Sequence, residues 1–343
     1  MTLSVFARSV LSKILGSIGI PEKVLRNRSG NGFVILMYHR VISLGDEKLP
    51  IQPGMYVDPK TFEEHIRYLK QHFLVIRFSE KFSPGCTGGK TQTIRPVCIL
   101  TFDDGWRDFY ENAYPILKRN CVPATVFLPT GYIGTEKSFW PDRLAWLLTS
   151  TISPTRQEIH GIRPENSVLE KIAGLTGSLE KRLETAINML KNFNDKEIEE
   201  VISRLKERAG VDLIPGGRVF LNWEEIREMV GSGLISFGSH TQNHRILVHL
   251  EEEEIREELV LSKETLFREG AVDPSFIPFC YPNGNWNDRI ARIVRETGYH
   301  AAVSTGNGWN PKGATPFDLK RVAIHQDMTA SREMFGCRIA EIL

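Results

Sequence analysis

Residues 97–105 read Val-Cys-Ile-Leu-Thr-Phe-Asp-Asp-Gly, an apolar run that ends abruptly in two carboxylates and a glycine. A continuous apolar run of this length is typical of a strand that is covered on both faces, as in parallel sheets. The adjacent carboxylates of Asp103 and Asp104 are costly to bury unless they are paired, hydrogen-bonded or bound to a metal. The stretch therefore predicts a buried strand with a polar site at its carboxyl end. The alternative is a turn in which one aspartate caps the next helix.

Short apolar runs alternate with helical patterns along the rest of the chain, which indicates β-α units and a largely parallel sheet. The other predicted strands span residues 33–38, 74–78, 124–128, 234–238, 276–280, 300–304 and 322–324. This number of strands favours an α/β fold, a distorted (β/α) barrel of seven to eight strands. An open doubly wound sheet is the alternative, although no Gly-x-Gly-x-x-Gly follows the first strand to favour a dinucleotide-binding fold.

Helix caps are recognisable at two places. Residues 58–71 have Asp58 as the cap and Pro59 at the first helical position. Residues 222–230 begin with Asn222, and Glu225 three positions later completes a capping box. Six glutamates between positions 251 and 258 are predicted to be the solvated first turns of a further helix.

The interval between the strands at 124–128 and 234–238 is far longer than a normal connection. Helical spacing over residues 178–192 and 195–209 predicts that residues 131–219 form a helical insertion in a loop of the barrel. Such loops lie at the catalytic face, so the insertion could gate the site or merely decorate the fold. The predicted organisation is an N-terminal helix and linker over residues 1–30, then a barrel over residues 31–343 with the insertion at 131–219.

Residues 3–18 have apolar side chains at helical spacing, interrupted by Arg8 and Lys13. The two charges argue against a signal peptide, and no apolar run approaches the roughly 18 residues of a membrane span. This helix either docks its apolar stripe on the domain body or attaches peripherally to a membrane surface. We expect a cytoplasmic protein, if attached then at the inner membrane surface, with an extracytoplasmic location as the alternative. The oligomeric state is not indicated.

Composition narrows the function classes only slightly. The chain has 343 residues, of which 41% are hydrophobic and 25% charged, as in ordinary globular proteins. Its net charge of +1 provides no field that would attract nucleic acid, so no nucleic-acid partner is expected. The five cysteines form no Cys-x-x-Cys pair, which argues against a zinc knuckle or a disulfide framework.

A second polar segment, Ser-His-Thr-Gln-Asn-His at residues 239–244, also follows a predicted strand. His240 and His244 stand at i and i+4, so they can bind one ion if the segment turns helically. Two histidines and one aspartate give three protein ligands and leave a coordination position open for water, as in catalytic zinc-type sites. The two segments together therefore predict a metal centre at the carboxyl ends of the strands.

Thr101-Phe102-Asp103-Asp104-Gly105 and His240-Thr241-Gln242-Asn243-His244 together resemble the first two motifs of the polysaccharide deacetylase group (NodB homology, carbohydrate esterase family 4). The resemblance extends over residues 33–325, with 131–219 as an insertion. It implies a distorted (β/α) barrel that hydrolyses the N-acetyl group of a sugar in a poly- or oligosaccharide and releases acetate. The segment at 139–144 resembles deacetylases associated with exopolysaccharide synthesis.

The same resemblance implies roles for the polar residues. Asp104, His240 and His244 would bind one divalent metal, with Zn²⁺ favoured and Co²⁺, Ni²⁺, Mn²⁺ or Fe²⁺ also suited to such a set. Asp103 would be the general base, and the partner would be an N-acetylated carbohydrate. The general acid has two candidates. His325 lies near the histidine that much of the family uses, whereas His39 follows the first strand as in poly-N-acetylglucosamine deacetylases, and we favour His39.

The third family motif departs from its usual Arg-x-Pro-Tyr-Gly, since residues 279–284 read Phe-Cys-Tyr-Pro-Asn-Gly. Cys280 replaces the arginine that would hold the catalytic aspartate, and Arg321 is a candidate substitute. The bend remains, so a backbone N–H near Asn283 could bind an oxyanion. Tyr281 and Trp309 are further candidates for the substrate site. The missing arginine leaves a non-catalytic glycan-binding barrel as an alternative function, beside a deacetylase or amidase for another amide substrate.

Overall fold

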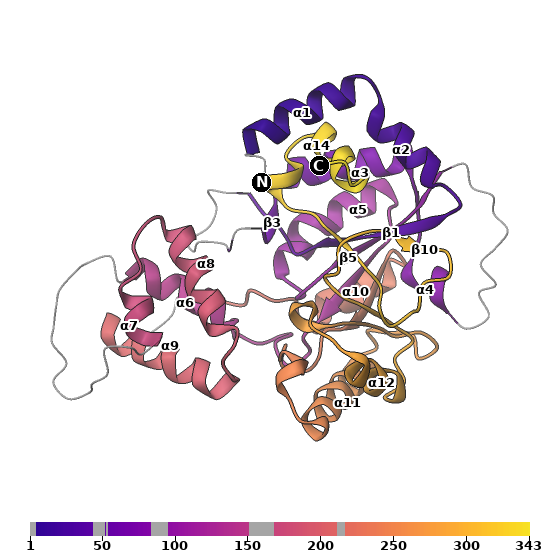
Figure 1. Cartoon of the computed structure of the whole chain (residues 1–343). Helices are drawn as coiled ribbons and strands as arrows, with labels where there is room; N and C mark the ends of the chain where they lie inside the picture. The colour runs from indigo at the N-terminus through magenta and orange to yellow at the C-terminus, as the bar shows by residue number, and fades with distance from the viewer. Residues whose placement is uncertain (1–4, 44–51, 53, 84–94, 151–167, 211–216) are drawn as a thin grey trace. The chain divides into compact units, whose positions relative to one another are not determined.

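The computed structural model describes residues 5–43, 52, 54–83, 95–150, 168–210 and 217–343, which group into two compact units (Figure 1). The larger unit comprises Met1–Leu44, Tyr56–Thr135 and Arg218–Leu343, and the smaller comprises Gly45–Met55 and Glu136–Gly217. Each unit is described by itself.

One sheet forms the centre of the larger unit, with strand order β10-β1-β5-β6-β7-β8-β9. The strands are β1 (Gly32–Tyr38), β5 (Val97–Phe102), β6 (Ala124–Leu128), β7 (Ile235–Ser239), β8 (Pro278–Cys280), β9 (Ala301–Val303) and β10 (Asn310–Pro311). From β1 to β9 every neighbouring pair is parallel, and β10 lies antiparallel at the start of β1. All of β6 and nearly all of β1 and β5 is buried, as their continuous apolar sequences predict.

The sheet curls back on itself through the last strand. β11 (Val322–Ala323) pairs in parallel with β1, while Leu319, just before it, forms a parallel bridge with Val303 of β9. Residues 319–323 therefore connect the two ends of the parallel run. The strands follow one another around the sheet in chain order, without the reversal that defines a doubly wound fold. The predicted distorted (β/α) barrel is confirmed, as a curled sheet that closes incompletely.

Several predicted strands are shorter in the structure than in the sequence. The prediction at 74–78 is reduced to β4 (Leu74–Val75), because Phe78 already begins α4 (Phe78–Phe82). The two-residue strands β2 (Arg40–Val41) and β3 (Tyr56–Val57) were not predicted, and they pair only with each other. Two-residue strands are too short to show any periodicity.

Helices cover the sheet of the larger unit. They are α1 (Val5–Ser17), α2 (Ile20–Arg28), α3 (Pro59–His72), α5 (Tyr114–Asn120), α10 (Trp223–Gly231), α11 (Glu252–Arg268), α12 (Asp288–Glu296), α13 (Gln326–Thr329) and α14 (Arg332–Ile339). Both predicted caps are confirmed. Asp58 accepts a hydrogen bond from the N–H of Lys60, and Asn222 forms a reciprocal capping box with Glu225. Among the described helices, none has both the length and the apolar character that crossing a membrane requires.

The smaller unit is helical, with α6 (Trp140–Ser150), α7 (Val168–Ala173), α8 (Leu179–Leu190) and α9 (Asp195–Ala209) around a core of its own. The helices predicted at 178–192 and 195–209 are present as α8 and α9. An Arg143–Glu199 ion pair joins α6 to α9. The bounds of 131–219 for an insertion stay a prediction, and residues 151–167 and 211–216 within it lie outside the described residues.

Candidate active site

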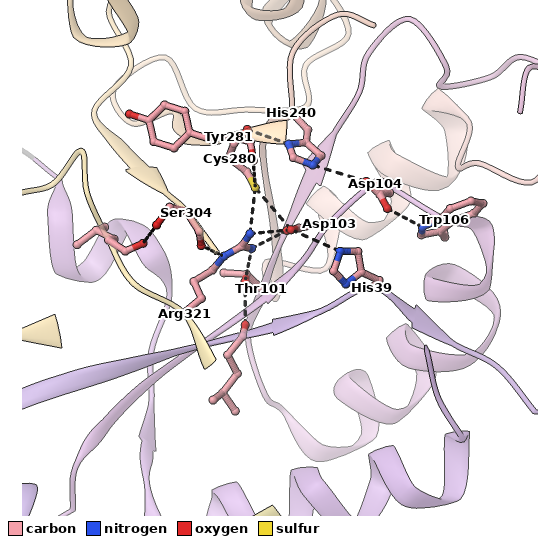
Figure 2. A network of polar contacts seen from close by, with 12 residues as sticks. His39, Thr101, Asp103, Asp104, Trp106, His240, Cys280, Tyr281, Ser304 and Arg321 are labelled. Atoms are coloured by element: carbon pink, nitrogen blue, oxygen red, sulfur yellow. Dashed lines mark hydrogen bonds and ion pairs between the residues drawn. The ribbon is translucent and has the colours of Figure 1, made fainter. Parts of the chain in front are cut away.

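The polar residues predicted for the site meet at the carboxyl edge of the parallel strands. His39 follows β1, Asp103 and Asp104 follow β5, and His240 follows β7 (Figure 2). Parallel strands that curl into a barrel bring their carboxyl ends together, which explains why distant segments of the chain converge here. Asp103, Asp104 and His240 are each less than 5% exposed.

Asp104, His240 and His244 are close enough to hold one metal ion. Asp104 Oδ1 lies 3.5 Å from His240 Nε2 and 3.4 Å from His244 Nε2, and one ligand atom from each of the three residues lies within 4.8 Å of the others. The histidines do not converge through the helical turn that the sequence suggested. Instead, the segment is a loop in which Thr241 (φ 65°) and His244 (φ 57°) adopt the left-handed region. Asp104 (φ 72°) does the same, and such backbone strain is typical of functional sites.

The surroundings of these three residues suit a bound cation. His240 Nδ1 lies 2.8 Å from the carbonyl oxygen of Cys280, so Nδ1 donates its proton there and Nε2 is left as the ligand atom. Trp106 Nε1 donates to Asp104 Oδ2 at 3.0 Å, which leaves Oδ1 toward the histidines. Burial, with a smaller contribution from His244, lowers the pKa of His240 to about 4, so the ring is neutral as a metal ligand must be. Burial raises the pKa of Asp104, and a cation beside it would oppose that shift.

Asp103 faces a different partner. Its two carboxylate oxygens accept hydrogen bonds of 2.7 Å each from the Nη1 and Nη2 atoms of Arg321, in a bidentate ion pair. Burial alone would raise the pKa of Asp103, but the charge and hydrogen bonds of Arg321 outweigh burial and hold the pKa well below its usual range. Asp103 is therefore a fixed carboxylate at neutral pH.

Arg321 is itself buried and fully engaged. Its Nε donates to the carbonyl of Ser304 at 2.9 Å, and its Nη1 donates to Thr101 Oγ1 at 3.2 Å. Its Nη2 lies 3.2 Å from the sulfur of Cys280, whose thiol is 3.6 Å from Asp103 Oδ2. The sequence left open what replaces the arginine missing at position 280. The structure brings Arg321 to Asp103, and because its side chain is 0% exposed, it orients the carboxylate rather than contacting substrate.

A second group, Asp103, His240 and Cys280, is also close enough to hold a metal. Two features oppose a cation there. The guanidinium of Arg321 already occupies both oxygens of Asp103. Burial also raises the pKa of the Cys280 thiol well above its usual value, whereas a sulfur ligand must be a thiolate. The set of Asp104, His240 and His244 is the better metal site.

The two general-acid candidates differ in what they touch. His39 Nε2 lies 3.9 Å from Asp103 Oδ2, and its side chain is 16% exposed, so it lies beside the candidate base and is partly open to solvent. His325 Nδ1 lies 3.4 Å from Asp327 Oδ2, an ion pair that does not involve Asp103. Burial lowers the pKa of His325. The geometry keeps His39 as the better placed candidate.

Two of the predicted substrate-site residues do not reach the site. Trp309 precedes β10, which pairs with the start of β1, so it lies at the opposite edge of the sheet from His39. Its Nε1 donates to the carbonyl of Ile339 at 2.8 Å, and the prediction that it lines the sugar site is wrong. Tyr281 is fully buried, its hydroxyl donates to the Phe317 carbonyl, and Figure 2 shows its ring directed away from Asp103. A side chain committed in this way cannot contact substrate.

Asn283 remains at the site edge. It lies in the 3-10 turn η3 (Pro282–Gly284) directly after β8, and it is exposed. Its backbone is left-handed (φ 54°), and its side-chain amide donates to Asn285 Oδ1. Its predicted part in binding an oxyanion stays a prediction.

Glu258 is a positioning residue that the sequence analysis missed. It was assigned to a solvated charge run, yet it is only 4% exposed. Its carboxylate accepts 2.7 and 2.8 Å hydrogen bonds from the backbone N–H and the side-chain amide of Asn243, which stands between the two histidine ligands. Ile255 and Leu259 at helical spacing were the available signal, because they place Glu258 on the buried face of α11.

Trp106 is the second residue missed. Besides its bond to Asp104, its ring stacks on Phe220 at 4.8 Å, and the guanidinium of Arg40 lies 4.5 Å from the ring centre. Arg40 is in turn held by Asp108 at 2.8 Å. The position of Trp106 directly after the Asp-Asp-Gly turn was the only sequence signal for this role.

Comparison with known proteins gives a consistent result. A family model described as polysaccharide deacetylase matches residues 90–169 and 177–302, more than half of the chain. A Bacillus subtilis protein whose name places it among polysaccharide deacetylases is 28% identical over 141 residues, 40% of this chain and 47% of the relative. A poly-beta-1,6-N-acetyl-D-glucosamine N-deacetylase of Staphylococcus aureus is 41% identical over 125 residues, 34% of this chain and 42% of the relative. The chain thus spans under half the length of these curated relatives.

Solved structures share the fold. The deacetylase PplD of Streptococcus pyogenes, in complex with acetate, has a TM-score of 0.54 at 19% identity, covering 87% of this chain and 94% of its own. IcaB from Ammonifex degensii has a TM-score of 0.55 at 20% identity, covering 90% of this chain and 98% of its own. At this identity the likeness establishes the fold alone.

Proposed function

The chain belongs to the polysaccharide deacetylase family, and we propose that it removes N-acetyl groups from sugars of a poly- or oligosaccharide by metal-dependent hydrolysis. The observation that carries the proposal is that two adjacent carboxylates have different partners. Asp104 faces two histidine nitrogens at 3.5 and 3.4 Å, while Asp103 is held as a carboxylate by Arg321. A hydrolytic site of this kind needs both a cation and a base, and the residues that would supply them lie side by side here.

Asp104, His240 and His244 would hold the ion, and we favour Zn²⁺, which accepts one carboxylate and two imidazoles. A bound ion of this type polarises the carbonyl of the acetamido group and makes a bound water more acidic. The hydrogen bonds from Trp106 to Asp104 and from His240 to the Cys280 carbonyl keep the ligand atoms directed at one point.

Asp103 would accept the proton of the attacking water as the oxygen adds to the acetamido carbon. Arg321 keeps it ionised and fixes the direction of its oxygens through two parallel hydrogen bonds. His39, 3.9 Å from Asp103, would then donate a proton to the departing nitrogen. The carbon–nitrogen bond breaks, and the products are acetate and a free amino sugar.

The substrate class follows from the family, and the relative named for poly-beta-1,6-N-acetyl-D-glucosamine suggests the first polymer to test. A non-catalytic glycan-binding barrel was considered because the third motif has Cys280 in place of an arginine. Arg321 supplies a guanidinium to Asp103 from another strand, so that argument for a non-catalytic barrel loses its basis.

The test is acetate release from purified protein across β-1,6-linked N-acetylglucosamine oligomers, chitooligosaccharides and small acetamides. Each reaction would be run after chelation and again after adding back Zn²⁺, Co²⁺, Ni²⁺ or Mn²⁺. We expect turnover of at least one N-acetyl sugar oligomer that disappears with chelation and returns with metal. Binding of these oligomers without acetate release under any metal would favour the glycan-binding alternative, and turnover of small acetamides alone would favour an amidase.

A further inference from the structure

The outward face of α1 is an apolar ridge. Phe6, Val10 and Ile14 are 79%, 44% and 55% exposed, and Ile18, just beyond the helix end, is 66% exposed. A spacing of four residues places side chains one above the other on the same side of a helix. These four residues are the majority of the seven large hydrophobic side chains that are exposed among the described residues. The exposure is therefore concentrated on one surface.

The opposite face of α1 fixes this orientation. Ser12 is fully buried, and α1 packs along α14. Arg8 and Ser12 line a small cavity together with Met328 and Met334. A surface helix normally turns its apolar stripe toward the core. Here Ser12 is buried and Leu11 and Leu15 are half-buried. Docking on the domain body, one of the two interpretations of this helix, therefore leaves the ridge uncovered.

The charges carried by α1 and α2 are almost all positive. α1 contains Arg8 and Lys13 and no acidic residue. Lys13 is exposed and directly precedes Ile14 of the ridge. α2, which follows, exposes Lys23 and Arg26. Glu22 is the single carboxylate in residues 5–28. An apolar helical face bordered by lysine and arginine is the combination that binds anionic lipid headgroups.

We propose that the ridge Phe6–Val10–Ile14–Ile18 docks on an anionic lipid bilayer, with α1 lying in the plane of the interface. At 13 residues the helix is about 20 Å long, too short to cross the hydrocarbon layer. Its apolar side chains would enter the acyl boundary while the basic side chains stay among the headgroups.

The test is co-sedimentation of the full chain with vesicles of phosphatidylcholine alone and with phosphatidylglycerol added. The wild type should sediment with the anionic vesicles, and much less with the neutral ones. Phe6→Ser/Ile14→Ser should weaken binding to anionic vesicles by at least about 100-fold, since two large apolar side chains no longer enter the bilayer. Lys13→Glu should weaken it by about tenfold or less and only at low salt.

The matched control is Val260→Ser/Leu261→Ser, which removes two exposed apolar side chains from α11 instead. It should bind as the wild type does, and both double variants should keep the wild-type thermal unfolding temperature. Failure of the wild type to bind either vesicle would overturn the proposal, as would equal binding of the ridge variant. A wild-type dimer that the ridge variant alone converts to monomer, without vesicle binding, would assign the ridge to contact between copies and also overturn it. None of these readouts depends on deacetylase activity.

Discussion

Asp103 and Asp104 are adjacent in the chain and similarly buried, yet their surroundings shift their pKa values in opposite directions. Burial raises the pKa of both carboxyls. Arg321 reverses the direction for Asp103, whereas Asp104 meets two imidazoles and an indole N–H and keeps a raised pKa. Burial alone therefore assigns no role. Arg321, just before β11, makes Asp103 a fixed anion, whereas Asp104 lies beside two histidines with which it could share a cation.

The comparison is tested most severely by exchanging each aspartate for asparagine. Asp103→Asn should lower kcat by about 10³–10⁴-fold and leave bound metal near the wild-type amount, because the base is lost and the ligands are not. Asp104→Asn should lose the metal, and activity with it. The measurements are acetate release and elemental analysis of both proteins purified in parallel.

Asparagine keeps an oxygen for one Arg321 bond, but thermal unfolding must accompany these assays because an unpaired buried charge destabilises a fold by about 3–5 kcal/mol. The assignments of Asp103 as base and Asp104 as ligand would be reversed by one result. In it, the Asp103→Asn protein is folded but lacks metal, whereas the Asp104→Asn protein still contains it.

The next largest effect separates the two histidines. His39→Gln should reduce kcat by about 10²–10³-fold with metal retained, since His39 lies beside Asp103 and is partly exposed to solvent. His325→Gln is the matched control and should reduce it by less than about fivefold, because its nearest charged contact is Asp327 rather than the base. Equal losses in the two variants would mean that the 3.9 Å approach of His39 has no catalytic meaning.

Arg321→Lys tests whether the paired hydrogen bonds from Arg321 are what prepares Asp103 for its role. Lysine keeps the charge but cannot make two parallel bonds to a carboxylate, so kcat should fall by about 10²-fold with metal unchanged. The sign of the pH effect follows from the shift. The charge and the hydrogen bonds of Arg321 both lower the pKa of Asp103. Lysine keeps the charge but loses the paired hydrogen bonds, so that pKa should rise and the acid limb of kcat/KM should move to higher pH. A purely structural Arg321 would lower the amount of active enzyme without moving the limb.

The sequence predicted the site as far as its signals were local. The strand at 97–102 and both polar segments were predicted correctly because each apolar run is followed directly by its functional residues. The Asp103–Arg321 pair could only be suggested, because it joins residues 218 positions apart and requires the sheet to curl until β11 meets β1. No local pattern encodes that closure.

The failures have the same origin. Tyr281 was expected at the substrate site because it belongs to a motif, but its hydroxyl finds the carbonyl of Phe317, 36 residues away. Trp309 was expected there because indoles suit sugars, but the antiparallel pairing of β10 carries it to the far edge. Side-chain type suggested a function in both cases, and long-range packing decided otherwise.

Substitution of Glu258 has the smallest predicted effect, and it tests how the loop that carries His244 is held beside Asp104. Its two oxygens accept both bonds from Asn243 and so hold the left-handed loop that brings His244 to Asp104. In Glu258→Gln one of these acceptors becomes a donor facing a donor, which loosens the loop. Metal affinity should weaken by about tenfold, the lower end for residues that orient metal ligands. Competition with a chromogenic chelator measures it without reference to activity.

Glu257→Gln is the matched control, an exposed neighbour on α11 that should leave the affinity unchanged. Unfolding of the metal-free proteins separates the loop from the fold as a whole. Loss of metal affinity in proportion to lost stability would make Glu258 an ordinary buried anchor of α11. A weakened affinity in a metal-free protein of near wild-type stability would mean that the histidine side of the site, like the Asp103 side, depends on a charged residue from outside its own motif. The two aspartates would then differ in the sign of the group that fixes their surroundings, a guanidinium for the base and a carboxylate for the ligand loop.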